Sequence, residues 1–482
     1  MRFDVFVLCR NADCANNKSV VQSILGRAGV PCTRAVLGVS FDDNREPSMA
    51  ARCVHTGFRL AAAVATLVAL GTNATTAADL GGSCCADLEE RIAELEATTA
   101  RKGNRKVSLT ISGYVAQAVT YWDDGGEANT YLWGLGPTQT SHVKFTGQAQ
   151  IAPGWTAGYV IRIQNLSDNP FGSSQARPNA RDDLNTQMSY WYIQSKDLGK
   201  ISMGQQAHAG KSAAMFTDQS GTQIISSYVL FDGAGFQLRR ADGTLAPVTW
   251  GNLGFCYSQA RPWGGDCNGI VNEGVRYDSP TFAGFTLSAS WAEDDFWEVA
   301  GRYAGEVAGF KLLAGIAYSE NTDERNQPPA APFAGFAVKD SNYFQVGGYA
   351  QHLATGLFLH AAYGREDNSE TVLLTGVTPP DSEHWTVKAG IRQKWTALGT
   401  TILWGEYTEY DDQIGPAALA AGATSSEFTK WGGGVAQEID AAAMTLWLKY
   451  RRQEADIEAP AAAGLDAIED LHMVTGGGMI NF

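Results

Sequence analysis

From residue 107 onward, apolar and polar residues alternate with a period of two in one segment after another. In residues 107–115, aliphatic residues and Gly occupy the odd positions and mostly hydroxyl-bearing residues the even ones. The same pattern recurs at 142–151, 155–164, 285–291, 310–318, 385–391 and 444–450, and it is weaker at 187–194. Such alternation predicts β-strands with one apolar and one polar face.

The connections between these segments alternate in length. Short connections are expected at 152–154, 197–199, 279–283, 307–309, 354–356, 397–399 and 440–442. Mostly longer, polar connections are expected at 123–139, 167–184, 207–269, 321–341, 368–381, 412–427 and 456–468, with one short member at 293–296. Short turns at one rim and long loops at the other are typical of outer-membrane barrels. The pattern predicts an all-β fold, a 16-stranded antiparallel transmembrane β-barrel over residues 107–482.

The final alternating segment, 471–482, ends on Phe482. In this class of barrel, the last strand pairs with the first and carries an aromatic residue at the periplasmic rim. We therefore expect Phe482 to act as an assembly signal that the outer-membrane assembly machinery reads.

The N-terminal region divides into three parts before the barrel. Residues 49–78 have a basic start, an apolar core at 60–70 and a small-residue exit, which predicts a cleaved secretory signal peptide. Residues 1–48 lie upstream of it and are interpreted as a misassigned N-terminal extension. Residues 79–106 are expected to hold a short periplasmic helix, with its apolar stripe at Leu88, Ile92 and Leu95, and a basic linker. That helix could form a three-stranded bundle or lie against the barrel mouth.

Composition narrows the possible functions. The formal net charge is −15 and the pI is about 4.9, which argues against a nucleic-acid partner. Mean hydropathy is −0.17, and no apolar run reaches the length of a spanning helix. The sequence contains no G-x-S-x-G, phosphate-loop or H-E-x-x-H motif, and its histidines lack metal-ligand spacing. We therefore expect no enzyme activity, metal or cofactor.

Sixteen strands enclose a water-filled lumen, so residues that face inward contact what passes through. By alternation, the inward face carries an excess of basic residues over Glu298, Glu306 and Glu406. These predicted pore-lining residues are Lys144, Arg162, Arg276, Arg302, Lys311, Lys388, Arg392, Lys449 and Arg451.

The third long connection, at about 207–269 and called loop 3 below, is unusually long for an unconstrained surface loop. We expect it to fold into the lumen, where its carboxylates would oppose the basic wall and set a field across the constriction. The loop residues expected there are Asp218, Asp232, Asp242, Arg239 and Arg240. The alternative is an outward receptor surface. Cys256 and Cys267 are expected to form a disulfide near the end of the loop.

Residues 82–109, Gly274 to Pro280 and the terminal Asn481-Phe482 resemble the general porins of rhizobial alphaproteobacteria. The resemblance extends over about residues 79–482. It implies a trimeric sixteen-stranded diffusion channel in which loop 3 forms an eyelet.

Together these features predict an outer-membrane porin for passive diffusion of small hydrophilic solutes and ions. The expected partners are membrane lipid and lipopolysaccharide, two further copies in a homotrimer, and the assembly machinery. The alternatives are a substrate-specific sugar or anion channel, a surface adhesin or receptor, and an outer-membrane enzyme.

Overall fold

The computed structural model describes residues 106–482, except for 138, 167, 179–183, 230–231, 260, 262–263, 270, 294 and 324–335. The expected N-terminal extension, the signal peptide and all but the last residue of the helix and linker lie outside the described residues. No helix in the described part of the chain is long and apolar enough to cross a membrane.

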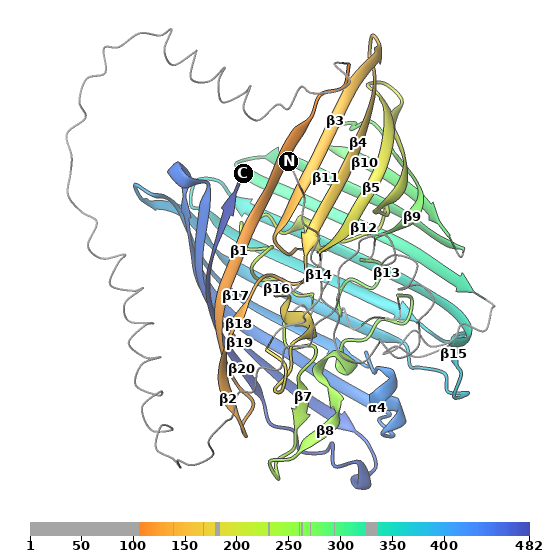
Figure 1. Ribbon diagram of the computed structural model, residues 1–482, viewed down its shortest axis with the longest axis vertical. Helices are drawn as coiled ribbons and strands as arrows, with labels where there is room; N and C mark the ends of the chain where they lie inside the picture. The colour runs from red at the N-terminus through yellow and green to blue at the C-terminus, as the bar shows by residue number, and fades with distance from the viewer. Residues whose placement is uncertain are drawn as a thin grey trace, which may run out of the picture. The chain divides into compact units, whose positions relative to one another are not determined.

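Sixteen long antiparallel strands form a closed barrel (Figure 1). The strands are β1 (Thr110–Asp123), β3 (His142–Ala152), β4 (Trp155–Asn165), β5 (Leu184–Ser195), β6 (Gly199–Ala207), β9 (Val271–Asp278), β10 (Phe285–Ala292), β11 (Phe296–Val307), β12 (Phe310–Asp323), β13 (Phe336–His352), β14 (Leu357–Asp367), β16 (Ser382–Thr396), β17 (Gly399–Asp411), β18 (Ser425–Ile439), β19 (Met444–Glu458) and β20 (Leu471–Asn481). Strand β20 pairs with β1 from Asn481 opposite Tyr114 to His472 opposite Asp123, which closes the barrel. The predicted strand number and fold class are confirmed.

Shorter elements lie in the connections between the long strands. They are the strands β2 (Ala128–Trp133), β7 (Gln237–Arg239), β8 (Leu245–Thr249) and β15 (Val372–Leu373), and the helix α4 (Pro416–Ala420). Single 3-10 turns are η1 (Pro170–Gly172), η2 (Met215–Thr217), η3 (Trp250–Leu253), η4 (Asp440–Ala442) and η5 (Ala461–Ala463). Sequence periodicity did not predict these as elements, because each is too short to show a repeat, although η4 lies at the short connection expected at 440–442.

Two strands differ from the sequence pattern. The first strand was expected from residue 107 but begins at Thr110. The weakly alternating segment 187–194 lies within β5, whose pairing with β4 shifts register between Arg162 and Ile163. The shift lies at Gln187, and beyond it the two faces alternate regularly, with Ser189, Trp191 and Ile193 exposed. The alternation is weak in sequence because the inward face carries Met188, Tyr190 and Tyr192, which are apolar or aromatic like the outward residues.

The two faces of the barrel differ as the pattern predicted. In β1, Val115 and Val119 are 56% and 44% exposed. Ala116 and Thr120, the residues that follow them, are fully buried. The outward face is therefore an apolar band of the kind that contacts lipid tails.

Aromatic side chains ring the outward face near the long-loop rim of β11 to β19. This set, called the aromatic girdle below, comprises Trp297, Tyr318, Tyr363, Trp385, Tyr407, Trp431 and Tyr450. Several of its polar atoms donate to carboxylates at the band's upper edge, as in Tyr407 to Glu409 at 2.7 Å and Trp431 to Glu454 at 2.9 Å. Aromatic residues with one apolar and one hydrated end favour the membrane interface.

Inside the long-loop rim, loop segments share a buried apolar core. It includes residues from β1, β2, the β7–β8 hairpin and the residue before it, η3, the α4 segment, β18 and β20: Trp122, Trp133, Phe236, Val248, Trp250, Ile414, Phe428 and Leu471. Trp122 and Phe236 pack edge to face with ring centroids 5.0 Å apart. The second half of loop 3 is therefore held as a packed layer against the wall and its neighbouring loops.

Candidate functional site: a lumen narrowed by loop 3

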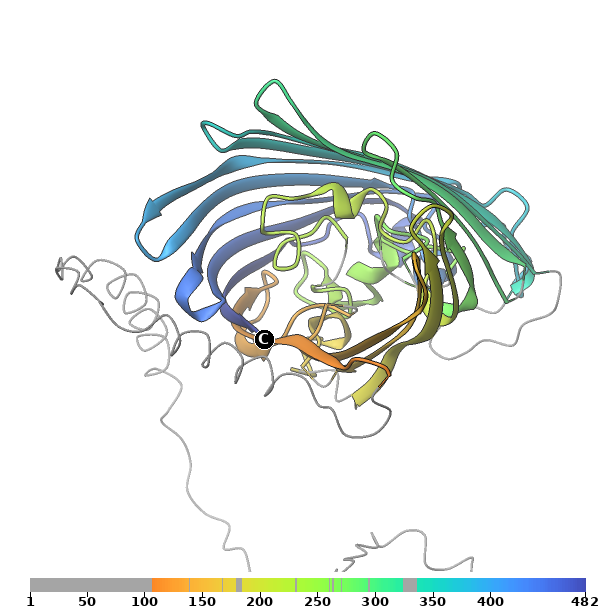
Figure 2. The ribbon, with the colours of Figure 1, turned by 90° about the horizontal axis from the view of Figure 1, so that it is seen from above.

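Loop 3 connects β6, which ends at Ala207, to β9, which begins at Val271, and it lies within the ring of strands (Figure 2). Two arginines of the wall hold its first residues. Arg276 donates to the carbonyl oxygens of Ala207 and His208 at 3.0 and 2.9 Å, and Arg302 donates to that of Ala209 at 2.7 Å. These arginines therefore turn the chain inward as it leaves β6.

The loop then runs close along β12 and β13, where two inward-facing glycines make room for it. A Cβ at Gly315 would lie 2.2 Å from the carbonyl oxygen of Ala213, and one at Gly347 would lie 2.7 Å from that of Ala214. Side chains of ordinary size at these positions would displace the loop backbone. Inward glycines in alternating strands are a sequence signal for this contact.

Two loop carboxylates form buried ion pairs with the far wall. Asp218 accepts from Lys388 at 2.8 Å, and Lys388 also lies 3.5 Å from Glu406. Asp232 accepts from Arg451 at 2.5 and 2.7 Å and from Lys449 at 3.1 Å. Arg451 also binds Glu406. These six residues are called the loop-3 anchor below: Asp218, Asp232, Lys388, Glu406, Lys449 and Arg451.

The sequence predicted an electric field across the constriction, between the loop carboxylates and the basic wall. The structure instead has direct ion pairs between them. Asp218 and Asp232 face the basic wall as expected, but they are only 5% and 7% exposed and contact its cations directly. Because buried charges need close partners, the anchor fixes the loop's position across the lumen. The charges of the loop-3 anchor therefore mainly fix the position of loop 3.

The acidity of the two loop carboxylates follows from these contacts. Burial alone would raise the pKa of Asp218, but the nearby Lys388 ammonium outweighs it and holds the pKa below its usual range. For Asp232, Arg451 and Lys449 outweigh burial in the same way and hold the pKa well below its usual range. Both carboxylates therefore stay charged, and the anchor intact, throughout neutral and mildly acidic pH.

Lys430 was missed by the sequence analysis and is a further anchoring residue. It is 1% exposed and donates to the carbonyl oxygens of Ser227, Tyr228 and Val229 at 3.3, 2.6 and 3.3 Å. Its ammonium also lies 5.6 Å from the centre of the Tyr410 ring. Alternation with Phe428 on β18 would have placed it on the inward face.

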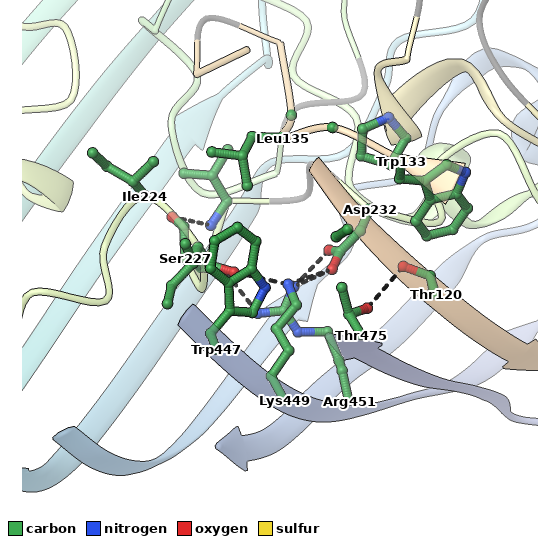
Figure 3. A pocket seen from close by; sticks show the side chains of 16 residues that line it. Thr120, Trp133, Leu135, Ile224, Ser227, Asp232, Trp447, Lys449, Arg451 and Thr475 are labelled. Carbon is green, nitrogen blue, oxygen red and sulfur yellow. Dashed lines mark hydrogen bonds and ion pairs between the residues drawn. The ribbon is translucent and has the colours of Figure 1, made fainter. Parts of the chain in front are cut away.

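A small cavity of about 40 Å³ remains between loop 3 and the wall formed by β1, β19 and β20 (Figure 3). Trp447, Ile224 and Leu135 give it apolar sides, and Lys449 and Arg451 approach it while bound to Asp232 (Figure 3). Thr120 and Thr475 share a hydrogen bond of 3.0 Å at its edge. This volume suits a few water molecules and not a solute.

The remaining predicted wall residues lie in three places. Lys144 and Arg162 face one another on β3 and β4, and Arg162 approaches Nδ1 of His142 at 3.1 Å. Lys311 is half-buried opposite Glu306 in the β11–β12 register. Arg392 pairs with Glu438 at 2.8 Å, and both side chains are partly exposed, near the loop tip at Gly221.

Three predicted loop residues lie in or beside the β7–β8 hairpin. Arg239 pairs with Asp124 at 2.9 Å, and Arg240 donates to the carbonyl oxygens of Gly464 and Ala463. Asp242 is exposed at the hairpin tip, where it accepts from the backbone N–H of Thr244 at 2.8 Å. The structure thus gathers Asp218 and Asp232 in the anchor and sets these three apart at the long-loop rim. The Asp242-Gly243 turn signal could have indicated this hairpin.

Cys256 and Cys267 form a disulfide in the last part of loop 3, as the sequence predicted. Both are fully buried beside Tyr343 of β13. Phe482 exchanges backbone hydrogen bonds with Gly113 at 2.9 and 3.0 Å at the short-turn rim. Its recognition by assembly machinery stays a prediction.

A family model described as Gram-negative porin matches residues 61–467. The chain belongs to the Gram-negative porin family. Membership and the closed barrel together make it an outer-membrane porin that forms a channel. No curated protein sequence matches this porin significantly.

Among solved structures, the anion-selective porin from Comamonas acidovorans resembles this porin with a TM-score of 0.50 and 16% identity, covering 78% of this chain and 100% of that one. OmpT of Vibrio cholerae and the OmpF–daunomycin complex of Salmonella typhi match with TM-scores of 0.46 and 0.47 and identities of 10% and 14%. Each match covers 79% of this chain and 99% of the other. At 16% identity, the first likeness supports the fold.

Proposed function

We propose that this porin passes small hydrophilic solutes and ions by passive diffusion, and that the space between loop 3 and the wall limits their size. The anchored position of loop 3 inside a sixteen-stranded barrel is the observation that supports this most strongly. A barrel of this width has a water-filled lumen, and an inserted loop narrows it without closing a binding site around each solute.

We further propose that the channel prefers anions over cations. The three carboxylates of the loop-3 anchor contact its cations directly, and Lys430 adds a fourth cation to the group. Lys144 adds a half-buried positive charge on the opposite part of the wall. Because the anchor charges, Lys430, Glu298 and Asp266 are all buried or nearly so, Lys144 supplies the positive charge that we propose acts on passing ions. The Comamonas acidovorans porin, named anion-selective, has the same fold.

Reversal potentials in a KCl gradient test both proposals. We expect a linear current–voltage relation and a potential of the sign that indicates chloride preference, most clearly at low salt because screening is weakest there. Swelling of liposomes that contain the porin should be faster with smaller neutral sugars than with larger ones. Current that saturates with one sugar or one anion would favour the substrate-specific alternative.

We also propose a homotrimer, as the resemblance to general porins implies. The outward face of β1 and β3 to β5 bears exposed apolar residues such as Val115, Ile161 and Ile193, which a neighbouring copy could cover. Native mass spectrometry of the detergent-extracted porin counts its subunits, and a monomer would contradict the proposal.

A further inference from the structure

A single exposed phenylalanine stands out in the first half of loop 3. Among residues 208–229, all of them described, the only exposed residues are Phe216, Gln219 and Gly221, and Phe216 is 49% exposed. Burying its phenyl group against the wall would have been favourable, because apolar surface removed from water stabilises a fold. Since loop 3 lies within the ring of strands (Figure 2), the phenyl group is instead open to the lumen.

The local structure holds the phenyl group in this direction. Phe216 is the middle residue of η2, and in a 3-10 turn residues three positions apart share a face. One face, with Ala214 and Thr217, contacts the inward glycines of β12 and β13. Phe216 and Gln219 share another face, and both are exposed. Because the loop-3 anchor fixes Asp218 within the same segment, the turn keeps Phe216 directed away from its own wall.

Positive charge lies on the opposite side of the barrel. Strand β3 is halfway around the ring of sixteen strands from β13, and it carries the half-buried, inward-facing Lys144. Arg162 of β4 lies opposite Lys144 in the strand register. The pKa of Lys211, near the start of loop 3, is lowered to about 8, mainly by burial and partly by the charge of Arg162, which places Arg162 at the level of the loop. The phenyl group and the positive charge therefore border the same narrowed part of the lumen.

We propose that this porin favours aromatic carboxylates among the anions it passes, and that Phe216 is the residue that determines this specificity. The ring of the solute packs on Phe216 while its carboxylate points toward the cations of β3 and β4. The inference rests on the proposed anion-preferring channel and adds a class of solute to it. One aromatic contact is weak, so the solute leaves readily, as passage through a channel requires.

The test is the current through single channels in planar bilayers, with phenylacetate, acetate and benzylammonium as probes. In wild type, phenylacetate should interrupt the current briefly and more often as its concentration rises, whereas acetate should pass without interruptions. Benzylammonium carries the same ring with the opposite charge, and the cations of the wall should make its interruptions much rarer. In Phe216→Ser, the interruptions by phenylacetate should become about fivefold shorter, because one aromatic contact is lost.

A second exposed phenylalanine provides the matched control. Phe282 is 83% exposed in the short turn between β9 and β10, away from loop 3. Phe282→Ser should therefore keep the wild-type interruptions. Uniform conductance steps in KCl show that each variant has assembled. If Phe216→Ser gives no steps, Phe216→Leu takes its place, and the interruptions should again shorten because the aromatic contact is lost.

The outcomes separate this inference from the proposed function. Interruptions of equal length in wild type and in a channel-forming Phe216 variant would overturn the role of Phe216. Absence of interruptions by phenylacetate in a wild type that conducts chloride, or equally frequent interruptions by benzylammonium, would overturn the preference for aromatic carboxylates. In each of these cases the diffusion channel would stand. A wild type that conducts no ions would contradict the proposed function itself.

Discussion

Replacing Arg451 with methionine is expected to release loop 3 from the wall and to lower the heat stability of the folded porin markedly. Arg451 is 2% exposed and binds both Asp232 and Glu406. Its loss would leave two buried carboxylates with one cation fewer between them. Removing one partner of a buried ion pair costs about 3–5 kcal/mol. The midpoint of heat-induced unfolding measures the loss, and current noise in single channels measures the freed loop.

The next residue provides a matched control. Arg452 points to the outward face, where it pairs with Asp470 and Glu454 while its side chain remains 33% exposed. Exposed pairs contribute about 0–1 kcal/mol, so Arg452→Met should leave stability and current noise nearly unchanged. Equal losses in the two variants would show that the loop-3 anchor does not hold the loop.

A side chain added at a wall glycine tests the position of loop 3 without removing a charge. A Cβ at Gly347 would lie 2.7 Å from the carbonyl oxygen of Ala214, whereas one at the neighbouring Gly348 would lie 3.8 Å from its nearest atom, the carbonyl oxygen of Leu313. We expect Gly347→Ala to raise current noise in the same way as Arg451→Met. Gly348→Ala should behave as wild type.

Replacing Arg392 with glutamine is expected to shift permeability toward cations. Arg392 pairs with Glu438 at 2.8 Å, and the two side chains are 30% and 23% exposed. Without the arginine, the Glu438 carboxylate would stand unpaired near the loop tip. A unit charge acts on an ion 4 Å away with about 1 kcal/mol in water, which is about fivefold in the permeability ratio. The reversal potential at low salt measures the shift.

Adding Lys388→Met to this variant should raise current noise as well, because Lys388 belongs to the loop-3 anchor and its loss leaves Asp218 without its nearest cation. Lys394→Gln serves as the control, since Lys394 is 61% exposed and pairs with Asp440 at the short-turn rim. A reversal potential that stays at the wild-type value in Arg392→Gln would show that this pair does not border the conducting path.

The barrel could be predicted from sequence because period-two alternation records which face of each strand meets lipid. The lengths of the connections then distinguished the two rims. Strand β5 shows the limit of the method, since its inward face carries Met188, Tyr190 and Tyr192 and so does not read as polar in sequence.

The contacts of loop 3 could be predicted only in part. Alternation placed Lys388, Lys449 and Arg451 on the inward face, but loop 3 has no repeat that says where its own residues lie. Asp232 and Asp242 are ten positions apart and looked alike in sequence, yet one is buried in the anchor and the other lies at an exposed hairpin tip. Tertiary contacts across more than 200 residues make that difference, as in the bond between Asp232 and Arg451.

Single-channel conductance in planar bilayers is the most direct test of a diffusion channel narrowed by an anchored loop. We expect wild type to open in uniform steps whose size rises in proportion to salt concentration, and Arg451→Met to open in noisier, more variable steps. Absence of current steps in wild type, or quiet steps of identical size in both proteins, would contradict a diffusion channel narrowed by an anchored loop.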